Sequence, residues 1–82
     1  MKKETFITTD LPSKVEVTIG INDDDYGWFE FLDIKSGGNG WHAEGGLWFE
    51  GTTLVDYDGV FVLPDFILDK LESWGYNVDE IR

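Results

Sequence analysis

Very few side chains of this 82-residue chain could act in catalysis. His42 is the only histidine, cysteine is absent, and Ser13, Ser36 and Ser73 fall in predicted loops or at a helix end. Nucleophilic catalysis needs a base beside the nucleophile, and acid–base catalysis needs a matched pair in a pocket that excludes water. No serine is placed by its position in the sequence to pair with His42. We therefore predict that the protein is not an enzyme and that His42 lies on a strand surface.

Carboxylates and tryptophans suggest two further chemistries. Glu30 and Glu44 could form the carboxylate pair of a glycoside hydrolase, and Trp28, Trp41 and Trp48 could stack on sugars. A sheet of this size has no walls with which to enclose a sugar substrate, so hydrolysis is disfavoured. Sugar binding without catalysis stays open as a minor alternative.

Two acidic turns begin like a calcium-binding loop. They are Asp23–Asp25 and Asp56–Gly59. The EF-hand pattern requires a third oxygen ligand before the glycine and a glutamate at position twelve, where Ile67 stands when counting starts at Asp56. Both clusters are therefore interpreted as acidic turns, and the sequence predicts no metal site and no cofactor.

Alternating apolar and polar residues indicate the strands that must position these side chains. Residues 15–21 alternate strictly, which is typical of a half-buried strand. Similar patterns predict strands over 26–34, 41–50 and 52–57. A weaker pattern over 4–9 is consistent with an additional edge strand.

Turn residues separate these strands. Asn and Asp at 22–25 satisfy their own backbone and favour a hairpin turn, and the glycine-rich stretch 36–40 suits a longer hairpin loop. Gly45–Gly46 inside a strand indicates either a bulge or a close approach of another backbone segment. After the turn signal Asp58–Gly59, Val60–Val62 could add a short extended piece.

One helix is predicted over residues 64–74. Pro64 suits the first helical position, Asp65 and Asp69 lie near the positive end of the helix dipole, and Gly75 favours termination. Apolar residues recur on one helix face, namely Ile67, Leu68, Leu71 and Trp74. A helix this short needs to pack against a sheet to be stable.

These elements predict an α+β fold in one compact domain spanning residues 1–82, with 1–14 as a looser N-terminal segment. The expected architecture is an antiparallel meander of about four strands with one C-terminal amphipathic helix packed on one face. The predicted core consists of Val15, Val17, Ile19, Ile21, Phe29, Phe31, Leu47, Phe49, Ile67, Leu71 and Trp74. The other face is left uncovered, and the alternation places on it Glu16, Glu30, Glu44, Glu50, Trp28 and Trp48.

The chain is strongly and unevenly acidic. Seventeen Asp and Glu oppose six Lys and Arg, which gives a net charge of −11, and residues 15–82 contain only Lys35, Lys70 and Arg82 as cations. B-form DNA carries about 18 negative charges along 30 Å of its axis, roughly the diameter of this globule. The protein therefore has a charge density of the same order as a DNA duplex. Such a field repels nucleic acid and anionic lipid and attracts basic protein surfaces.

Membrane and secretion signals are not evident in the sequence. No run approaches the roughly 18 apolar residues of a membrane span, and the basic first residues precede no apolar leader segment. Small secreted domains are usually cross-linked by disulfides, which this chain cannot form because it has no cysteine. We expect a cytoplasmic protein without a membrane partner, located in the host cell cytoplasm if a phage encodes it.

The segment Leu54–Pro64, which reads LVDYDGVFVLP and precedes the amphipathic helix, resembles the C-terminal part of small acidic bacteriophage and prophage proteins. Size, acidity and a sheet-plus-helix plan also resemble the anti-CRISPR inhibitors of the DNA-mimic type. The resemblance implies a protein that occupies a basic DNA-binding groove on a CRISPR surveillance complex or nuclease and blocks target recognition. Anti-CRISPR proteins share no common signature, so no functional residue transfers from them by position.

Carboxylates on such a protein would accept charge-assisted hydrogen bonds from arginines that otherwise hold DNA, and tryptophans would add apolar and cation–π contacts. The candidate partner-binding residues are Asp23, Asp24, Asp25, Trp28, Glu30, Glu44, Trp48, Glu50, Asp56 and Asp58. The predicted partner is a basic, nucleic-acid-binding host protein such as a CRISPR effector subunit, and no direct contact with nucleic acid is expected. The alternative is a non-catalytic interaction or structural module, including a homodimer through the uncovered face, whose acidity serves solubility.

Overall fold

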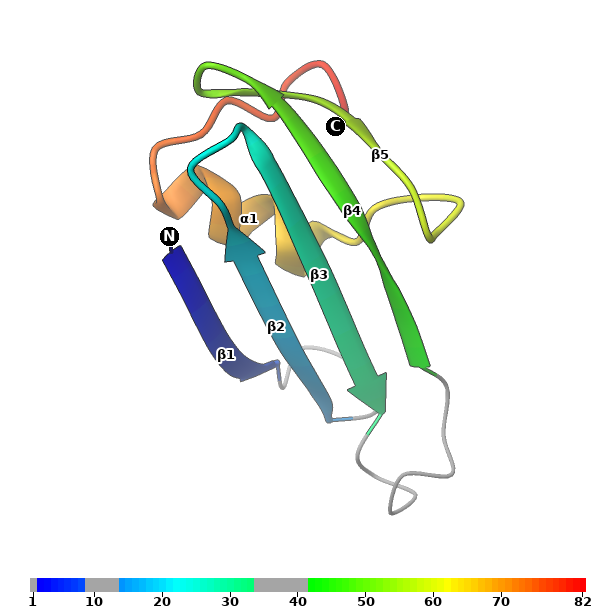
Figure 1. Cartoon of the computed structure of the whole chain (residues 1–82). Helices are drawn as coiled ribbons and strands as arrows, with labels where there is room; N and C mark the ends of the chain where they lie inside the picture. The colour runs from blue at the N-terminus through cyan, green and yellow to red at the C-terminus, as the bar shows by residue number, and fades with distance from the viewer. Residues whose placement is uncertain (1, 9–13, 34–41) are drawn as a thin grey trace.

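The computed structural model describes residues 2–8, 14–33 and 42–82, which form one antiparallel sheet and one helix. The elements are β1 (Lys2–Thr8), β2 (Val15–Ile21), β3 (Tyr26–Asp33), β4 (His42–Glu50), β5 (Thr53–Tyr57) and α1 (Asp65–Ser73). Each strand pairs with the next in the order β1-β2-β3-β4-β5, which confirms the predicted meander (Figure 1). The predicted loop at 36–40 and the predicted strand ends Ile34 and Trp41 lie outside the described residues.

The sheet has five strands rather than about four because the N-terminal segment forms a complete edge strand. β1 pairs with β2 along its whole length. The side of β1 that shares a face with the core carries Lys2 and Glu4 beside Phe6, so the sequence of β1 shows little apolar alternation. A hydrogen bond between the hydroxyls of Thr5 and Thr18, 2.9 Å apart, adds to the pairing on the other side.

α1 packs against one face of the sheet and leaves the other face uncovered, as predicted (Figure 1). Its buried residues are Ile67, Leu68 and Leu71. Pro64 occupies the N-cap, and the chain leaves the helix through Gly75, whose φ of 94° favours glycine. Trp74, predicted in the core, is half-buried at its margin because it caps the helix end, where Lys2 Nζ lies 4.7 Å from its ring centroid. Neither α1 nor any other described segment is a helix long and apolar enough to cross a membrane.

The core lies between α1 and the inner face of the sheet. The predicted strand residues are all buried there: Val15, Val17, Ile19, Ile21, Phe29, Phe31, Leu47 and Phe49. Leu54, Leu63, Leu68 and Val78 complete the core and were not part of the predicted set. After the helix, Asn77 forms a parallel bridge with Thr53, which places the fully buried Val78 beside β5 and covers part of the edge of that strand.

The segment between β5 and α1 passes close to β4. Val60–Val62 is a bend rather than the predicted extended piece, because Gly59 turns the chain with a φ of 89°. The backbone of Asp58 and Gly59 lies against Gly45, where a side chain would overlap the carbonyl oxygen of Asp58. Gly45 therefore marks a close approach of two backbone segments, which is one of the two alternatives predicted for this glycine pair.

Candidate interaction surface

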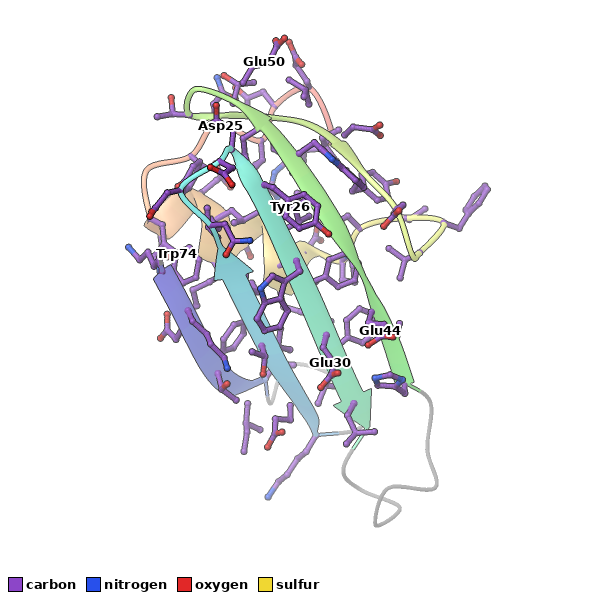
Figure 2. All side chains as sticks on the ribbon, viewed as in Figure 1. Asp25, Tyr26, Glu30, Glu44, Glu50 and Trp74 are labelled. Atoms are coloured by element: carbon purple, nitrogen blue, oxygen red, sulfur yellow. The ribbon has the colours of Figure 1, made fainter. Side chains whose placement is uncertain are left out.

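Alternate residues of β2, β3 and β4 build the uncovered side of the sheet. Because residues in register share a face, the pairing places there Glu16, Thr18, Tyr26, Trp28, Glu30, Leu32, His42, Glu44, Trp48 and Glu50, which we call the outer face. The glutamates and tryptophans expected on one side are thus together, as the alternation indicated. Figure 2 shows Tyr26, Glu30 and Glu44 along β3 and β4 on this side.

Three aromatic side chains lie on the outer face. Trp28 lies over Gly20, where an added Cβ atom would come within 2.6 Å of the indole. Trp48 lies over Gly46, where the corresponding distance is 2.8 Å, and its ring meets Tyr26 edge-on with centroids 5.5 Å apart. Tyr26 and Trp48 each remain 38% exposed. The two glycines therefore leave the space that holds the indoles close to the sheet.

An open groove of about 610 Å³ lies beside Trp28. Its lining combines the rings of Tyr26 and Trp28 with the acidic residues Glu30, Glu44 and Asp58 and with glycine backbone. Binding sites usually pair an apolar surface with a few convergent polar groups. The groove has this composition, although it is open to solvent along the sheet.

The two glutamates of the groove face each other. Glu30 and Glu44 are directly opposite in the β3–β4 register, and His42 Nε2 lies 3.5 Å from Glu30 Oε2. All three side chains are exposed, and one ligand atom of each lies within 4.8 Å of the others. One imidazole nitrogen and two carboxylate oxygens are ligands that a divalent ion such as Zn²⁺ accepts. Within the described chain these residues could hold a metal, and the same carboxylates can meet a cationic side chain.

Of the two predicted acids in β5 and directly after it, Asp58 lines the groove and Asp56 does not. Asp56 is opposite Trp48 in the β4–β5 pairing, which contains a bulge between Trp48 and Phe49. Asp58 Oδ1 accepts a hydrogen bond of 2.6 Å from the backbone N–H of Gly46. This bond fixes the Asp58 carboxylate at the rim of the groove.

The remaining predicted acids lie at the other end of β3 and β4. Asp23–Asp25 form the turn between β2 and β3, where Asp25 adopts a φ of 59°. Figure 2 shows Asp25 and Glu50 toward this end of the sheet, away from the pair Glu30 and Glu44. The predicted acids therefore form two groups along the molecule rather than one continuous cluster.

The single arginine of the chain pairs with acids of the helix. Arg82 forms ion pairs with Asp65, Asp69 and Glu72, and its distance to Asp69 is 2.9 Å. The hydrogen bond to Asp69 raises the pKa of the Arg82 guanidinium, and the charges of the neighbouring carboxylates act in the same direction. The positive charge of Arg82 offsets part of the acidity on the helix side.

Lys70 also pairs with an acid on the helix side. Lys70 of α1 lies 3.4 Å from Glu4, on the helix side of β1. Among the residues that the structure describes, Glu16, Glu44 and Glu50 have no lysine or arginine ion-pair partner. Lys70 and Arg82 thus pair with acids on the helix side, whereas Lys3 of β1 lies beside Trp28 on the outer side of the sheet and forms no ion pair with these three glutamates.

Several residues of this surface were not identified as binding residues from the sequence. Tyr26 shares the strand period of Trp28, so the alternation contained the signal for it. His42 joins the glutamates only through the register of β3 with β4. Phe61, in the bend after the groove, is 98% exposed, and its carbonyl accepts a hydrogen bond of 2.9 Å from the Tyr57 hydroxyl.

No protein-family model, curated protein sequence or solved structure matches the chain. The outer face is therefore interpreted from its own chemistry. It is an open, anionic sheet surface with aromatic side chains at its centre, and tyrosine and tryptophan are enriched in protein interfaces.

Proposed function

We propose that the protein binds a basic, nucleic-acid-binding surface of another protein through its outer face and thereby excludes nucleic acid from that surface. The partner would be a host DNA-binding enzyme, and the resemblance to anti-CRISPR inhibitors directs the choice to a CRISPR effector complex in the host cytoplasm. The mechanism is mimicry, because carboxylates accept the same charge-assisted hydrogen bonds from arginine as phosphates do. The proposal assigns no catalytic step to the protein.

The lack of lysine and arginine partners for the outer-face glutamates among the described residues is the observation that carries this proposal. Arg82 and Lys70 pair with acids on the helix side, whereas the outer face keeps its glutamates without lysine or arginine partners in the described chain. Uncompensated charges on one side create a directional potential, which accelerates the approach of an oppositely charged surface. Solubility alone would not require the outer-face glutamates to be left without lysine or arginine partners.

The aromatic residues of the outer face support the same interpretation. Tyr26, Trp28 and Trp48 lie between the two groups of acids, and aromatic side chains contribute much of the energy at the centres of protein interfaces. Charges around them would steer the partner and set its orientation. The arrangement fits an interface with an aromatic centre and an acidic periphery.

The alternative is a structural module that forms a homodimer through the same face. A two-fold interface brings the same patch of both subunits together. The acidic outer face of one copy would then lie against the acidic outer face of the other, and like charges brought together cost binding energy. The charge of the outer face therefore favours a basic partner over a second copy of the chain.

Competition with DNA tests the proposal. Purified CRISPR effector complexes are titrated with the protein, with and without their target DNA, over a salt series from about 50 to about 500 mM. We expect binding that DNA prevents and that weakens steadily as salt rises. Binding that DNA leaves unchanged, or salt-independent self-association in place of binding, would contradict mimicry.

Matched variants assign the effect to one face. The outer-face variant E16Q/E30Q/E44Q/E50Q removes four charges, and the helix-side variant E4Q/D65N/D69N/E72Q removes the same number from acids that pair with Lys70 or Arg82. We expect the first to lower affinity by about tenfold or more and the second to have a much smaller effect. Equal losses would show that only the total charge matters.

A further inference from the structure

We infer that the groove beside Trp28 is a subsite for an arginine side chain of the basic partner. The inference rests on the proposed function, because it names the chemical group that the outer face selects from that partner. Three features of the groove converge on a guanidinium: an aromatic ring beside which a cation already lies, a pair of opposed carboxylates, and an open shape lined partly by glycine backbone.

The first feature is the cation beside the Trp28 ring. Lys3 Nζ, from β1, lies 5.6 Å from the ring centroid, within the range of a cation–π contact. Tryptophan is the strongest of the aromatic residues in this interaction, and arginine makes it more often than lysine. The Trp28 ring is therefore suited to binding cations. Lys3 of the same chain already lies over this ring, so an arginine of the partner would have to compete with Lys3.

The second feature is the opposed pair Glu30 and Glu44, which lines the same groove as Trp28. A guanidinium carries five N–H donors in a fixed plane, so it can bridge two carboxylates while its face remains available for stacking. A lysine ammonium is a compact, strongly hydrated charge that cannot do both at once. An arginine would also relieve the repulsion between the two glutamates.

The third feature is the shape of the groove. Gly45 and Gly46 contribute backbone to its lining, and its volume of about 610 Å³ exceeds what one guanidinium needs. The groove is open to solvent, so a side chain that projects from a large partner can enter it directly. The bond that fixes Asp58 to Gly46 keeps a further carboxylate at the rim.

Two peptides of equal charge test the subsite. Hexa-arginine and hexa-lysine are titrated separately into the protein, and binding is followed by the NMR shifts of backbone amides and tryptophan indole N–H groups. We expect hexa-arginine to bind about two- to fivefold more tightly and to shift the Trp28 indole and the β3–β4 amides. Equal affinities, or shifts confined to α1, would overturn the inference.

Variants with matched charge locate the selectivity. E30Q/E44Q should abolish the preference for arginine, whereas E16Q/E50Q removes the same charge outside the groove and should weaken both peptides while preserving their ratio. K3Q should strengthen hexa-arginine binding more than K14Q, because only Lys3 lies over the Trp28 ring. Unchanged selectivity in E30Q/E44Q, or equal effects of K3Q and K14Q, would show that the groove does not hold the guanidinium.

Failure of the subsite is distinguishable from failure of the proposed function. If the outer-face variant loses its protein partner while the two peptides bind alike, the surface acts by charge alone and the arginine subsite is wrong. If DNA fails to compete for any effector complex while hexa-arginine is still selected, the subsite stands and the proposed mimicry is wrong. W28L, checked for folding by circular dichroism, should reduce the selectivity as E30Q/E44Q does.

Discussion

Glu30 and Glu44 occupy directly opposite positions on β3 and β4 and carry the same charge. Like charges in a cross-strand pair are destabilising, by an amount comparable to the ~0.2–1 kcal/mol that favourable pairs contribute. His42 Nε2 lies 3.5 Å from Glu30 Oε2, and the contact is an ion pair only when the imidazole carries a charge. The pair therefore lowers the stability of a small domain, and a bound cation would offset this cost. At the scale of single residues, the proposed binding of a cationic partner gives this unfavourable pair a role.

Neutralising one member of the pair should stabilise the protein. Glu44→Gln removes the repulsion and leaves the contact between Glu30 and His42 in place, so we expect the free energy of unfolding to rise by about 0.2–1 kcal/mol. The control is Glu16→Gln, since Glu16 is paired with Ile7 and Leu32 and faces no opposing acid. Urea denaturation of both variants at low salt measures the difference. A loss of stability in Glu44→Gln would show that the carboxylate makes a favourable interaction instead.

At the scale of elements, glycine shapes the contact between β4 and the segment that follows β5. Gly45 admits the backbone of Asp58 and Gly59, and this approach positions the Asp58 carboxylate at the groove. Gly46 leaves room for the Trp48 indole on the outer face. Adjacent glycines on opposite faces of one strand thus place two different parts of the site.

Adding a single methyl group at Gly45 should disturb this contact. Gly45→Ala would drive Cβ into the Asp58 carbonyl, and overpacking of this kind costs about 1–3 kcal/mol. Gly51→Asn is the control, because its φ of 61° is tolerated by asparagine and no atom lies within 4 Å of the added Cβ. Thermal unfolding should show a clear loss for the first variant and a small change for the second. Equal effects would mean that β4 and the segment after β5 adjust freely to each other.

Strand alternation predicted the central strands because valine, isoleucine and phenylalanine recur at every second position of β2 and β3. The edge strand β1 was harder to predict, since it shares its inner face between Lys2, Glu4 and Phe6 and depends on pairing with β2. The two-residue period of the strands was sufficient to predict the glutamates of the outer face. The groove could not be predicted in this way, because it depends on the β3–β4 register and on the path of the chain after β5, and both are set by tertiary packing.

At the scale of the whole molecule, the protein is elongated, with extents of 38 × 21 × 21 Å. Its length is close to one helical turn of DNA, about 34–36 Å. Eleven net negative charges over this length are roughly half the number on a duplex of 38 Å, which carries about 22. Part of this excess lies on the outer face, where Glu16, Glu44 and Glu50 have no lysine or arginine partner among the described residues.

Self-repulsion among the outer-face acids makes stability depend on salt. Raising NaCl from about 10 mM to about 500 mM shortens the screening length from about 30 Å to a few ångströms, so we expect the melting temperature to rise. In E16Q/E30Q/E44Q/E50Q this rise should be much smaller, because the unpaired charges are gone. In E4Q/D65N/D69N/E72Q it should persist, since these substitutions remove acids already paired with Lys70 or Arg82. Differential scanning calorimetry at matched pH measures all three proteins, and an equal salt response in both variants would show that the repulsion is spread over the whole surface.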